Sequence, residues 1–113
     1  MSDCIFCKIA AGEIPSNKVY EDEKIVAFHD IEPQAPVHVL IIPKEHIGCA
    51  DELTADNSAV VGYIFSKLPE ITGSLGLTNG YRIINNCRED GCQSVFHLHF
   101  HLLGGKKLGV QMG

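Results

Sequence analysis

The 113-residue chain has no tryptophan and few other aromatic residues, and only 20% of its residues are charged. It contains no run of lysine and arginine, and its formal net charge is −5. These absences argue against a protein that tracks the phosphate backbone of a nucleic acid. Aliphatic residues are plentiful, however, and 45% of the chain is hydrophobic. The composition is therefore not typical of a disordered segment.

Long hydrophobic runs are also missing, since the longest, such as Val37–Pro43, are far too short to span a membrane. The first residues lack a basic stretch followed by an apolar one, so we expect no secretory signal peptide. Five cysteines are an odd number in a chain without an export signal, which favours reduced thiols over a disulfide framework. We therefore expect a cytoplasmic protein with one domain over residues 1–113.

Periodicity and turn residues predict the order of the helices and strands. Apolar residues at helical spacing predict a short helix over 3–11 with Asp3 as its N-cap, and a long helix after Thr54. Pro69 lies inside the apolar stripe of the long helix and is expected to kink or split it. Strands are predicted over residues 19–21, 25–29, 37–42, 81–86 and 95–103. Hairpins grouped around one main helix indicate an α+β fold with an antiparallel sheet.

Three histidines, His97, His99 and His101, alternate with apolar residues near the end of the chain. Successive side chains of a strand point to opposite faces, so the three imidazoles are expected on one face and the apolar residues on the other. Near neutral pH an imidazole can act as a nucleophile, an acid or base, or a metal ligand. A surface strand with solvated histidines would show the same alternation. The polar stretch before the histidines and the glycine pair after them favour a functional site.

Two kinds of site fit three histidines on one strand. They can bind a catalytic zinc ion, or a neutral imidazole can attack phosphorus and form a covalent intermediate. The preceding residues 90–94 favour the second kind. Gln93, Ser94 and the backbone N–H groups of a glycine-containing bend are donors that suit phosphate oxygens.

Cys4 and Cys7 form a Cys-x-x-Cys pair at the other end of the chain. The spacing alone leaves open half of a zinc site, a redox motif or two buried thiols. A redox motif is disfavoured because the pair does not follow a strand of a βα unit. A zinc site needs two further ligands, and His46 and His97 are the candidates for a closed Cys₂His₂ tetrahedron. The other cysteines are expected to be unligated thiols: Cys49, Cys87 and Cys92.

Residues 97–103 fit the signature His-φ-His-φ-His-φ-φ, where φ is apolar, and here the chain resembles the histidine triad family. The similarity covers nearly the whole chain, through residues 28–31, 33–38, 42–44, 80–82, 86, 91, 93–95 and 104–105. The Gln-Ser pair before the triad and the Gly-Gly pair after it are similar to the Hint branch, the histidine triad nucleotide-binding proteins. The resemblance implies a HIT-like fold: an antiparallel sheet of about five strands, one long and one short helix, and sheets joined across a homodimer.

The resemblance also implies a purine nucleotide-binding hydrolase of nucleoside 5′-phosphoramidates, which cleaves the P–N bond between AMP and an amine. His99 would be the nucleophile that becomes a nucleotidyl-histidine, and His101 would contact the phosphate. His38 would support the triad from the neighbouring strand, and Ser94 would assist the departing amine. The nucleotide-binding residues would be Asp30, Ile31, Phe28, His29, Asn86, Gln93, Ser94, His99, His101, Ile5, Phe6 and Ile9.

Some members of this family bind zinc through an N-terminal Cys-x-x-Cys pair, the histidine after Pro-Lys-x and the first triad histidine. The corresponding residues are Cys4, Cys7, His46 and His97. The implied zinc is structural, and no catalytic metal is required by the mechanism.

The chain departs from the Hint pattern at Cys92, where a glycine is usual, and in its tail over residues 106–113. Two alternative functions remain beside the phosphoramidate hydrolase. One is a dinucleoside polyphosphate hydrolase or nucleotidyltransferase. The other is a zinc-stabilised nucleotide-binding adaptor whose catalysis is incidental.

Overall fold

The computed structural model describes residues 3–112, which form five strands, two α-helices and one short 3₁₀ helix. In chain order these are α1 (Ile5–Ala10), β1 (Lys18–Glu21), β2 (Ile25–His29), β3 (Val37–Pro43), η1 (Ala50–Glu52), α2 (Ala59–Ser74), β4 (Arg82–Asn85) and β5 (Phe100–Gly104). The strands form one antiparallel sheet in the order β1-β2-β3-β5-β4. The α+β fold expected from the sequence is confirmed, as are its five-stranded antiparallel sheet, long helix and short helix.

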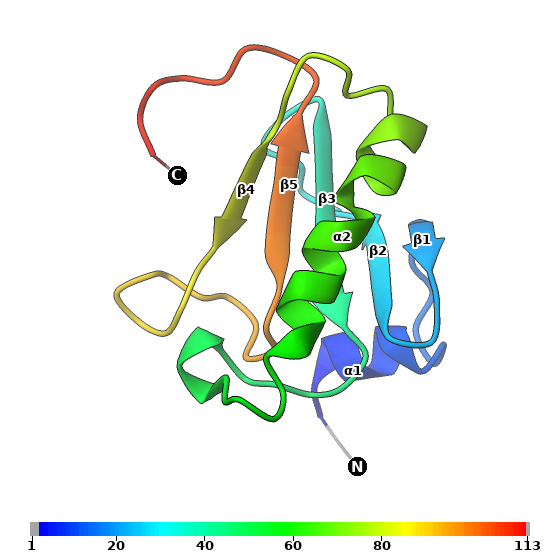
Figure 1. Ribbon diagram of the computed structural model, residues 1–113, viewed down its shortest axis with the longest axis vertical. Helices are drawn as coiled ribbons and strands as arrows, with labels where there is room; N and C mark the ends of the chain where they lie inside the picture. Colours follow the sequence, from blue (N-terminus) through cyan, green and yellow to red (C-terminus); the bar gives the residue numbers. More distant parts are fainter. Residues whose placement is uncertain (1–2, 113) are drawn as a thin grey trace.

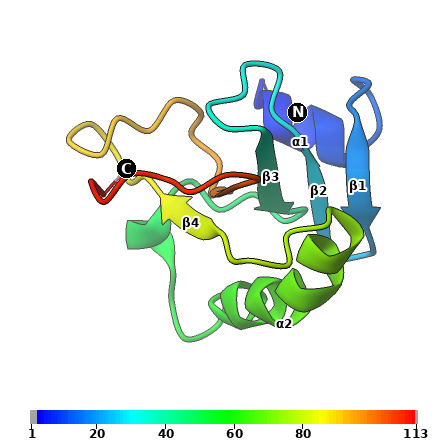
Figure 2. The same cartoon turned by 90° about the horizontal axis from the view of Figure 1, so that it is seen from above.

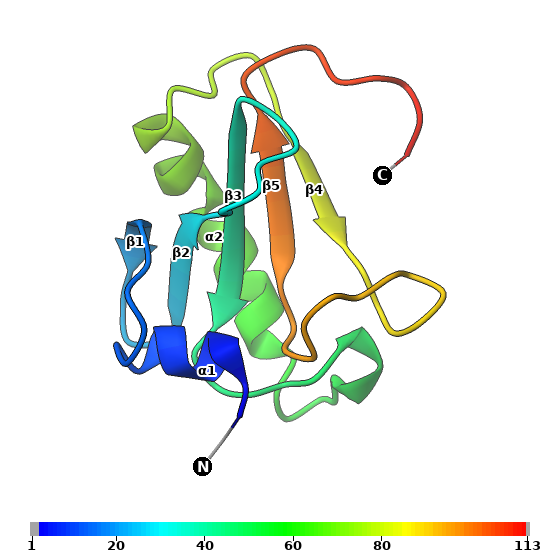
Figure 3. The same ribbon diagram turned by 180° about the vertical axis from the view of Figure 1, so that it is seen from behind.

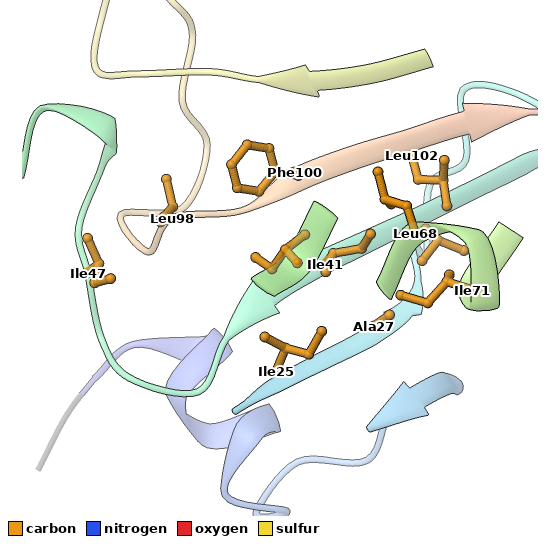
Figure 4. Close-up of a cluster of buried hydrophobic side chains, with 11 residues drawn as sticks. Ile25, Ala27, Ile41, Ile47, Leu68, Ile71, Leu98, Phe100 and Leu102 are labelled. Atoms are coloured by element: carbon orange, nitrogen blue, oxygen red, sulfur yellow. The ribbon is translucent and has the colours of Figure 1, made fainter. Parts of the chain in front are cut away.

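The two α-helices lie on opposite faces of the sheet (Figures 1 and 2). The larger hydrophobic core lies between the sheet and α2, as Figure 4 shows. Alternate residues of the central strands, such as Ile25, Ile41 and Leu102, point to this side and meet Leu68 and Ile71 of α2. The apolar stripe of α2 is therefore explained by its contact with one face of the sheet.

The opposite face of the sheet carries a smaller core and the histidines. Phe6 and Ile9 of α1 pack there against alternate residues of β2 and β3: Val26, Phe28, Leu40 and Ile42. Figure 3, viewed from this side, shows α1 crossing near one end of the sheet. On this face no helix of residues 3–112 covers β5. In the β3–β5 register His101 lies opposite Leu40, and directly paired residues share a face. His101 therefore points to the side that α2 leaves uncovered.

Most strand bounds agree with the sequence prediction to within one residue, but the last strand differs. It was expected over 95–103, whereas regular strand structure begins at Phe100. The N–H of His97 donates to the carbonyl of Val95 (2.8 Å) in a bend, and the N–H of Leu98 donates to the carbonyl of Ile47 (2.6 Å). These bonds use the backbone N–H groups of His97 and Leu98, which would otherwise be available to pair with a neighbouring strand. The chain nevertheless stays extended enough to keep the alternation of faces.

The predicted helix ends also need correction. The N-cap of α1 is Cys4 rather than Asp3, because the thiol of Cys4 accepts the N–H of Cys7 (3.3 Å). Thr54 caps a turn that precedes α2, with its hydroxyl accepting the N–H of Asp56 (3.1 Å), while α2 begins at Ala59. Pro69 does not split α2, which is continuous to Ser74. Its ring lies on the exposed side of the helix, where water can satisfy the carbonyl left without a donor.

No helix in the described part of the chain combines the length and the hydropathy needed to cross a membrane.

Candidate functional site

A cavity of about 710 Å³ lies on the face of the sheet that carries α1. It is bordered by α1, the segment 14–17, the end of β2 and the histidine segment. Of the residues expected at a nucleotide site, its lining includes Ile5, Phe6, Ile9, Phe28, His29, Asp30, Ile31, Ser94, His99 and His101. The fold thus gathers residues from both ends of the chain around one hollow that is mostly apolar and has a few polar groups at one side, as is usual for small-molecule sites.

His99 is almost fully buried, with 2% of its surface exposed. Its Nδ1–H donates to the carbonyl of His97 (2.7 Å), since a carbonyl can only accept. In the neutral ring Nε2 is then the unprotonated nitrogen. Burial lowers the pKa of His99, although the bond to His97 opposes this shift. The side chain is therefore a neutral imidazole with a lone pair on Nε2 at neutral pH.

His38 and His101 form a hydrogen-bonded chain beside His99. The backbone N–H of Gln34 donates to Nδ1 of His38 (2.9 Å), so the proton of the neutral His38 ring is on Nε2. That Nε2–H donates to Nδ1 of His101 (2.9 Å). Consequently His101 carries its own proton on Nε2 and can act as a hydrogen-bond donor. Burial, followed by the neighbouring His99 and His38, lowers the pKa of His101 to about 4.

Asp30 lies beside the hydrogen bond between His38 and His101. One of its carboxylate oxygens is 3.4 Å from Nε2 of His38, and the other accepts the N–H of Glu32 (2.8 Å). Potential ligand atoms of Asp30, His38 and His101 all lie within 4.8 Å of one another, which would suit a metal ion. The proton on Nε2 of His38 already accounts for this closeness, because it is shared between two acceptors. We therefore interpret Asp30 and His38 as residues that fix the orientation and the proton position of His101, and not as metal ligands.

Cys4, Cys7, His46 and His97 converge at the start of α1, with ligand atoms within 4.8 Å of one another. Nδ1 of His97 lies 3.3 Å from Sγ of Cys4 and 3.5 Å from Sγ of Cys7. Nδ1 of His46 lies 3.2 Å from Sγ of Cys7 and 3.2 Å from Nδ1 of His97. This group could hold a metal ion.

The donor set of this group fits zinc. Nε2–H of His97 donates to the carbonyl of Pro43 (2.8 Å), which leaves Nδ1 unprotonated and turned toward the thiols. A tetrahedron with Zn–S bonds of about 2.3 Å and Zn–N bonds of about 2.0–2.1 Å places nitrogen and sulfur ligands about 3.5 Å apart. The observed separations match this spacing. Two sulfur and two nitrogen ligands would close the coordination shell, as in structural zinc sites.

The loop over residues 87–94 positions Ser94 at the cavity. Inside the loop Oε1 of Gln93 accepts the N–H of Arg88 (2.8 Å), and Nε2 of Gln93 donates to the carbonyls of Gly48 (2.8 Å) and Val95 (2.9 Å). The side chain of Gln93 therefore braces the loop, and Gln93 is absent from the cavity lining. Its expected contact with phosphate stays a prediction, as does that of Asn86, which borders a second cavity beside His101.

The departure at Cys92 falls at a backbone position that is strained for a residue other than glycine. Cys92 has a φ of 60° and Arg88 a φ of 61°, both in the left-handed region that favours glycine. Cys92 is exposed, whereas Cys49 is buried and contacts Cys87. Burial, and secondarily the thiol of Cys87, raise the pKa of Cys49, which keeps its thiol protonated. Within the described residues none of these three cysteines belongs to the metal-binding group.

Several supporting groups were missed from sequence because they act through the backbone or through distant contacts. The side-chain amide of Asn85 donates to the carbonyl of His99 (2.9 Å), and the N–H of Gln34 orients His38. Ser16 lines the cavity, and its buried hydroxyl has no hydrogen-bond partner among residues 3–112. In the sequence, Ser16 is only a polar residue beside an apolar segment. Such residues are too common to indicate a site.

Comparison with known proteins agrees with this geometry. The model of the HIT domain family matches residues 11–108. A "14 kDa zinc-binding protein" of Zea mays is 47% identical over 99% of this chain and 89% of its own length. A solved histidine triad protein from Clostridium difficile superposes with a TM-score of 0.95 at 46% identity, covering 99% and 98% of the two chains.

A solved HIT family hydrolase from Legionella pneumophila gives a TM-score of 0.93 at 45% identity, covering 98% of this chain and all of that one (100%). The resemblance drawn from the spacing of the histidines is thus matched by the family model and by the whole fold. The chain belongs to the HIT domain family.

Proposed function

We propose that this protein hydrolyses nucleoside 5′-phosphoramidates, with His99 as the nucleophile. The observation that carries the proposal is the proton order around His99, whose Nδ1–H is bound by the His97 carbonyl (2.7 Å). The lone pair of Nε2 is then available to attack phosphorus, and a neutral imidazole is a good nucleophile and later a good leaving group. The HIT family hydrolase from Legionella pneumophila, which is 45% identical, supports a hydrolytic reaction.

In this proposal His99 displaces the amine from phosphorus, so that a P–N bond to the leaving group breaks as the P–Nε2 bond forms. Nε2–H of His101 donates to a phosphate oxygen as negative charge develops there, and His38 keeps that proton in place. Ser94, at the rim of the cavity, assists the departing amine. Water then attacks the nucleotidyl-histidine and releases the nucleoside 5′-monophosphate.

The nucleoside occupies the cavity of about 710 Å³. We propose that the carboxylate of Asp30 accepts the ribose hydroxyls and that apolar side chains surround a purine base, with Phe6, Phe28 and Ile31 nearest to it. Ile31 is 94% exposed and so is available to cover a bound base. The remaining contacts with the nucleoside are assigned to Ile5, Ile9 and His29, and those with the phosphate oxygens to Asn86 and Gln93.

We also propose that Cys4, Cys7, His46 and His97 bind a structural zinc ion. The support is the donor set, its spacing, and the 47% identity to the 14 kDa zinc-binding protein of Zea mays. Bound zinc would supply a closed cross-link between α1 and the histidine segment. His97 then serves the metal while the backbone carbonyl of the same residue orients His99.

For the assembly we propose a homodimer, in which β4 joins the sheets because it is one of the two edge strands. For the compartment we propose the cytoplasm, where reduced cysteines such as those of the metal group are maintained.

The decisive experiment compares wild-type protein with His99→Ala on AMP linked to a simple amine. We expect the substitution to lower turnover by at least about a thousandfold while nucleotide binding, measured by calorimetry, stays within a few-fold. Rapid alkaline denaturation during turnover should trap labelled AMP on the wild type and none on the variant. Undiminished turnover by His99→Ala would remove the mechanism.

A dinucleoside polyphosphate hydrolase remains the second candidate, because Arg82, Lys106 and Lys107 line the second cavity beside His101. Their positive charges would suit additional phosphate groups. The same assay should include a dinucleoside polyphosphate. A higher kcat/KM for that compound than for the AMP-amine would favour the second candidate. Undetectable turnover of both compounds, with tight nucleotide binding, would favour the adaptor.

A further inference from the structure

Two cysteines outside the metal-binding group lie against each other at one end of the sheet. Cys49 is buried, with 2% of its surface exposed, and its thiol contacts that of Cys87. Cys87 is partly exposed and begins the loop over residues 87–94. The whole of α2 and β4 separates the two cysteines in the chain, so only the fold brings them together. The proposed hydrolysis uses neither thiol.

The contact between the thiols is part of a junction between this loop and the segment that contains Cys49. Nε2 of Gln93 donates to the carbonyl of Gly48 (2.8 Å), and the guanidinium of Arg88 donates to the carboxylate of Asp51 (3.0 Å). Figures 1 and 3 show η1 and the loop at the same end of the sheet. Because Gly48 and Asp51 flank Cys49, both bonds hold it against the loop. The closeness of the thiols is therefore a property of the fold.

The junction allows the two cysteines to become bonded. Sulfur atoms are closer in a disulfide than in non-bonded contact, so bonding draws the loop and the Cys49 segment together. The ion pair between Arg88 and Asp51 can follow this movement, because its side chains are 66% and 65% exposed. An oxidant reaches Cys87 from solvent, and a thiol reductant can later attack the bond from the same side. A cross-link at this position would therefore be reversible.

Movement at Cys87 reaches the nucleoside cavity through the loop. A Cβ at Gly91 would lie 2.7 Å from both the backbone nitrogen and the backbone oxygen of Cys87, so Gly91 packs directly on this residue and has to move with it. Ser94 follows this turn and lines the cavity. In the proposed function Ser94 assists the departing amine, and a displacement of about 1 Å at such a group can lower the rate by roughly a hundredfold.

We propose that Cys49 and Cys87 form a reversible disulfide when the protein meets a peroxide, and that this disulfide lowers the activity by moving the loop that carries Ser94. The sulfur of Cys87 attacks one oxygen of hydrogen peroxide, the O–O bond breaks, and a sulfenic acid and one water result. The thiol of Cys49 then attacks this sulfur, the S–S bond forms, and the S–O bond breaks as a second water leaves. Two thiols are thus oxidised by two electrons, and one peroxide is reduced to two waters.

The formation of the disulfide is independent of the proposed function, whereas the loss of activity rests on it. Transient disulfides of this kind are compatible with a reducing compartment, where they act as redox sensors.

The test treats the reduced full-length protein with a small molar excess of hydrogen peroxide and measures kcat/KM for the AMP-amine before and after. We expect a fall of at least about fivefold, which dithiothreitol reverses. Mass spectrometry of unreduced peptides should show Cys49 joined to Cys87 within one chain. Cys49→Ala should form no such link and keep its activity after the same treatment. Cys87→Ser gives the same comparison without altering the buried position. Cys92→Ser is the matched control, because its exposed thiol lies outside the pair, and it should behave like wild type.

Three outcomes overturn this inference and leave the hydrolase standing. One is the absence of the linked peptide in wild-type protein, and another is a linked peptide with unchanged kcat/KM. The third is an equal loss of activity in Cys49→Ala, because oxidation of Cys4 and Cys7, which that variant retains, would then be the cause.

Hydrogen exchange of the amides of residues 87–94 separates this inference from the proposed function. If the reduced protein does not hydrolyse the AMP-amine, the proposed function fails. A linked peptide with altered exchange in this loop, absent from Cys49→Ala, would still support the disulfide and its effect on the loop. A linked peptide with unaltered exchange would overturn that effect.

Discussion

Backbone groups determine which nitrogen of His38, His97 and His99 carries the proton. The carbonyls of His97 and Pro43 bind Nδ1–H of His99 and Nε2–H of His97, and the N–H of Gln34 reaches Nδ1 of His38. Because backbone positions are set by the sheet, the proton order follows from the fold itself. Identical side chains in one row thereby acquire different chemical roles.

At the scale of one residue, His38 is the clearest positioning group, because it touches His101 (2.9 Å) rather than the cavity around the nucleoside. His38→Ala should lower kcat about tenfold with little change in KM, since one hydrogen bond that orients His101 is lost. His38→Gln can still donate from its amide nitrogen and should recover part of the rate. Steady-state kinetics on the AMP-amine measures both values. Equal rates for wild type and His38→Ala would contradict the positioning role.

At the scale of elements, the loop over residues 87–94 connects β4 to the histidine segment and is closely packed on itself. A Cβ at Gly91 would lie 2.7 Å from both the backbone nitrogen and the backbone oxygen of Cys87. Backbone atoms cannot rotate away as a side chain can. The loop therefore has to shift if this glycine is replaced.

Gly91→Ala should lower kcat/KM by at least about tenfold and the free energy of unfolding by about 1–3 kcal/mol, because the shift moves Ser94 and strains the loop. Gly62→Ala is the matched control: it lies on the exposed side of α2 with no heavy atom within 4 Å of its added Cβ. That control should raise the free energy of unfolding by about 0.5–1 kcal/mol and leave activity unchanged. Urea unfolding and turnover of the AMP-amine measure both effects. Full activity in Gly91→Ala would show that the loop is not needed in this conformation.

At the scale of the whole molecule, the metal-binding group links the N-terminal helix to the histidine segment. Protein prepared without added zinc should contain one zinc per chain, and chelation should lower the free energy of unfolding by at least about 3 kcal/mol. Cys7→Ser should lose the metal, whereas Cys92→Ser, an exposed thiol outside the group, should keep it. Elemental analysis and thermal unfolding give the two readouts. A metal-free protein indifferent to chelators would refute the zinc proposal.

His38, which is buried, and His101, which borders the cavity, also make stability depend on pH. Burial lowers the pKa of His38 and that of His101, the latter to about 4. Below the ordinary histidine pKa of about 6.5 the unfolded chain binds protons that the folded chain does not. The free energy of unfolding should therefore be highest above pH 6.5 and fall as the pH drops toward 4, by up to about 1.4 kcal/mol per pH unit for each histidine.

Urea unfolding between pH 7.5 and pH 4.5 measures this dependence. His101→Gln should flatten the slope relative to wild type, and the difference between the two proteins removes any contribution from acid-induced metal loss. Parallel slopes would show that His101 titrates normally in the folded protein.

Local patterns in the sequence were sufficient for the first four strands, the alternation of histidines with apolar residues, and the Cys-x-x-Cys pair. Alternation needs only the two-residue period of extended chain, which survives even where His97 and His99 precede the regular strand. The bend at His97 could not be predicted, because it depends on a hydrogen bond between Leu98 and Ile47, which are distant in the chain. The continuity of α2 through Pro69 likewise depends on which side of the helix faces solvent.

Residue types and their spacing thus indicated an α+β protein with an imidazole row and a Cys-x-x-Cys pair, because both are properties of short segments, and the resemblance to the histidine triad family pointed to the other two members of the candidate metal group. Tertiary structure decided how those groups are used. It directed Nδ1 of His97 toward the cysteines, committed the amide of Gln93 to backbone partners, and set Lys106 and Lys107 beside His101. Each of these outcomes depends on contacts between segments far apart in the chain, which only the packed sheet, helices and tail bring together.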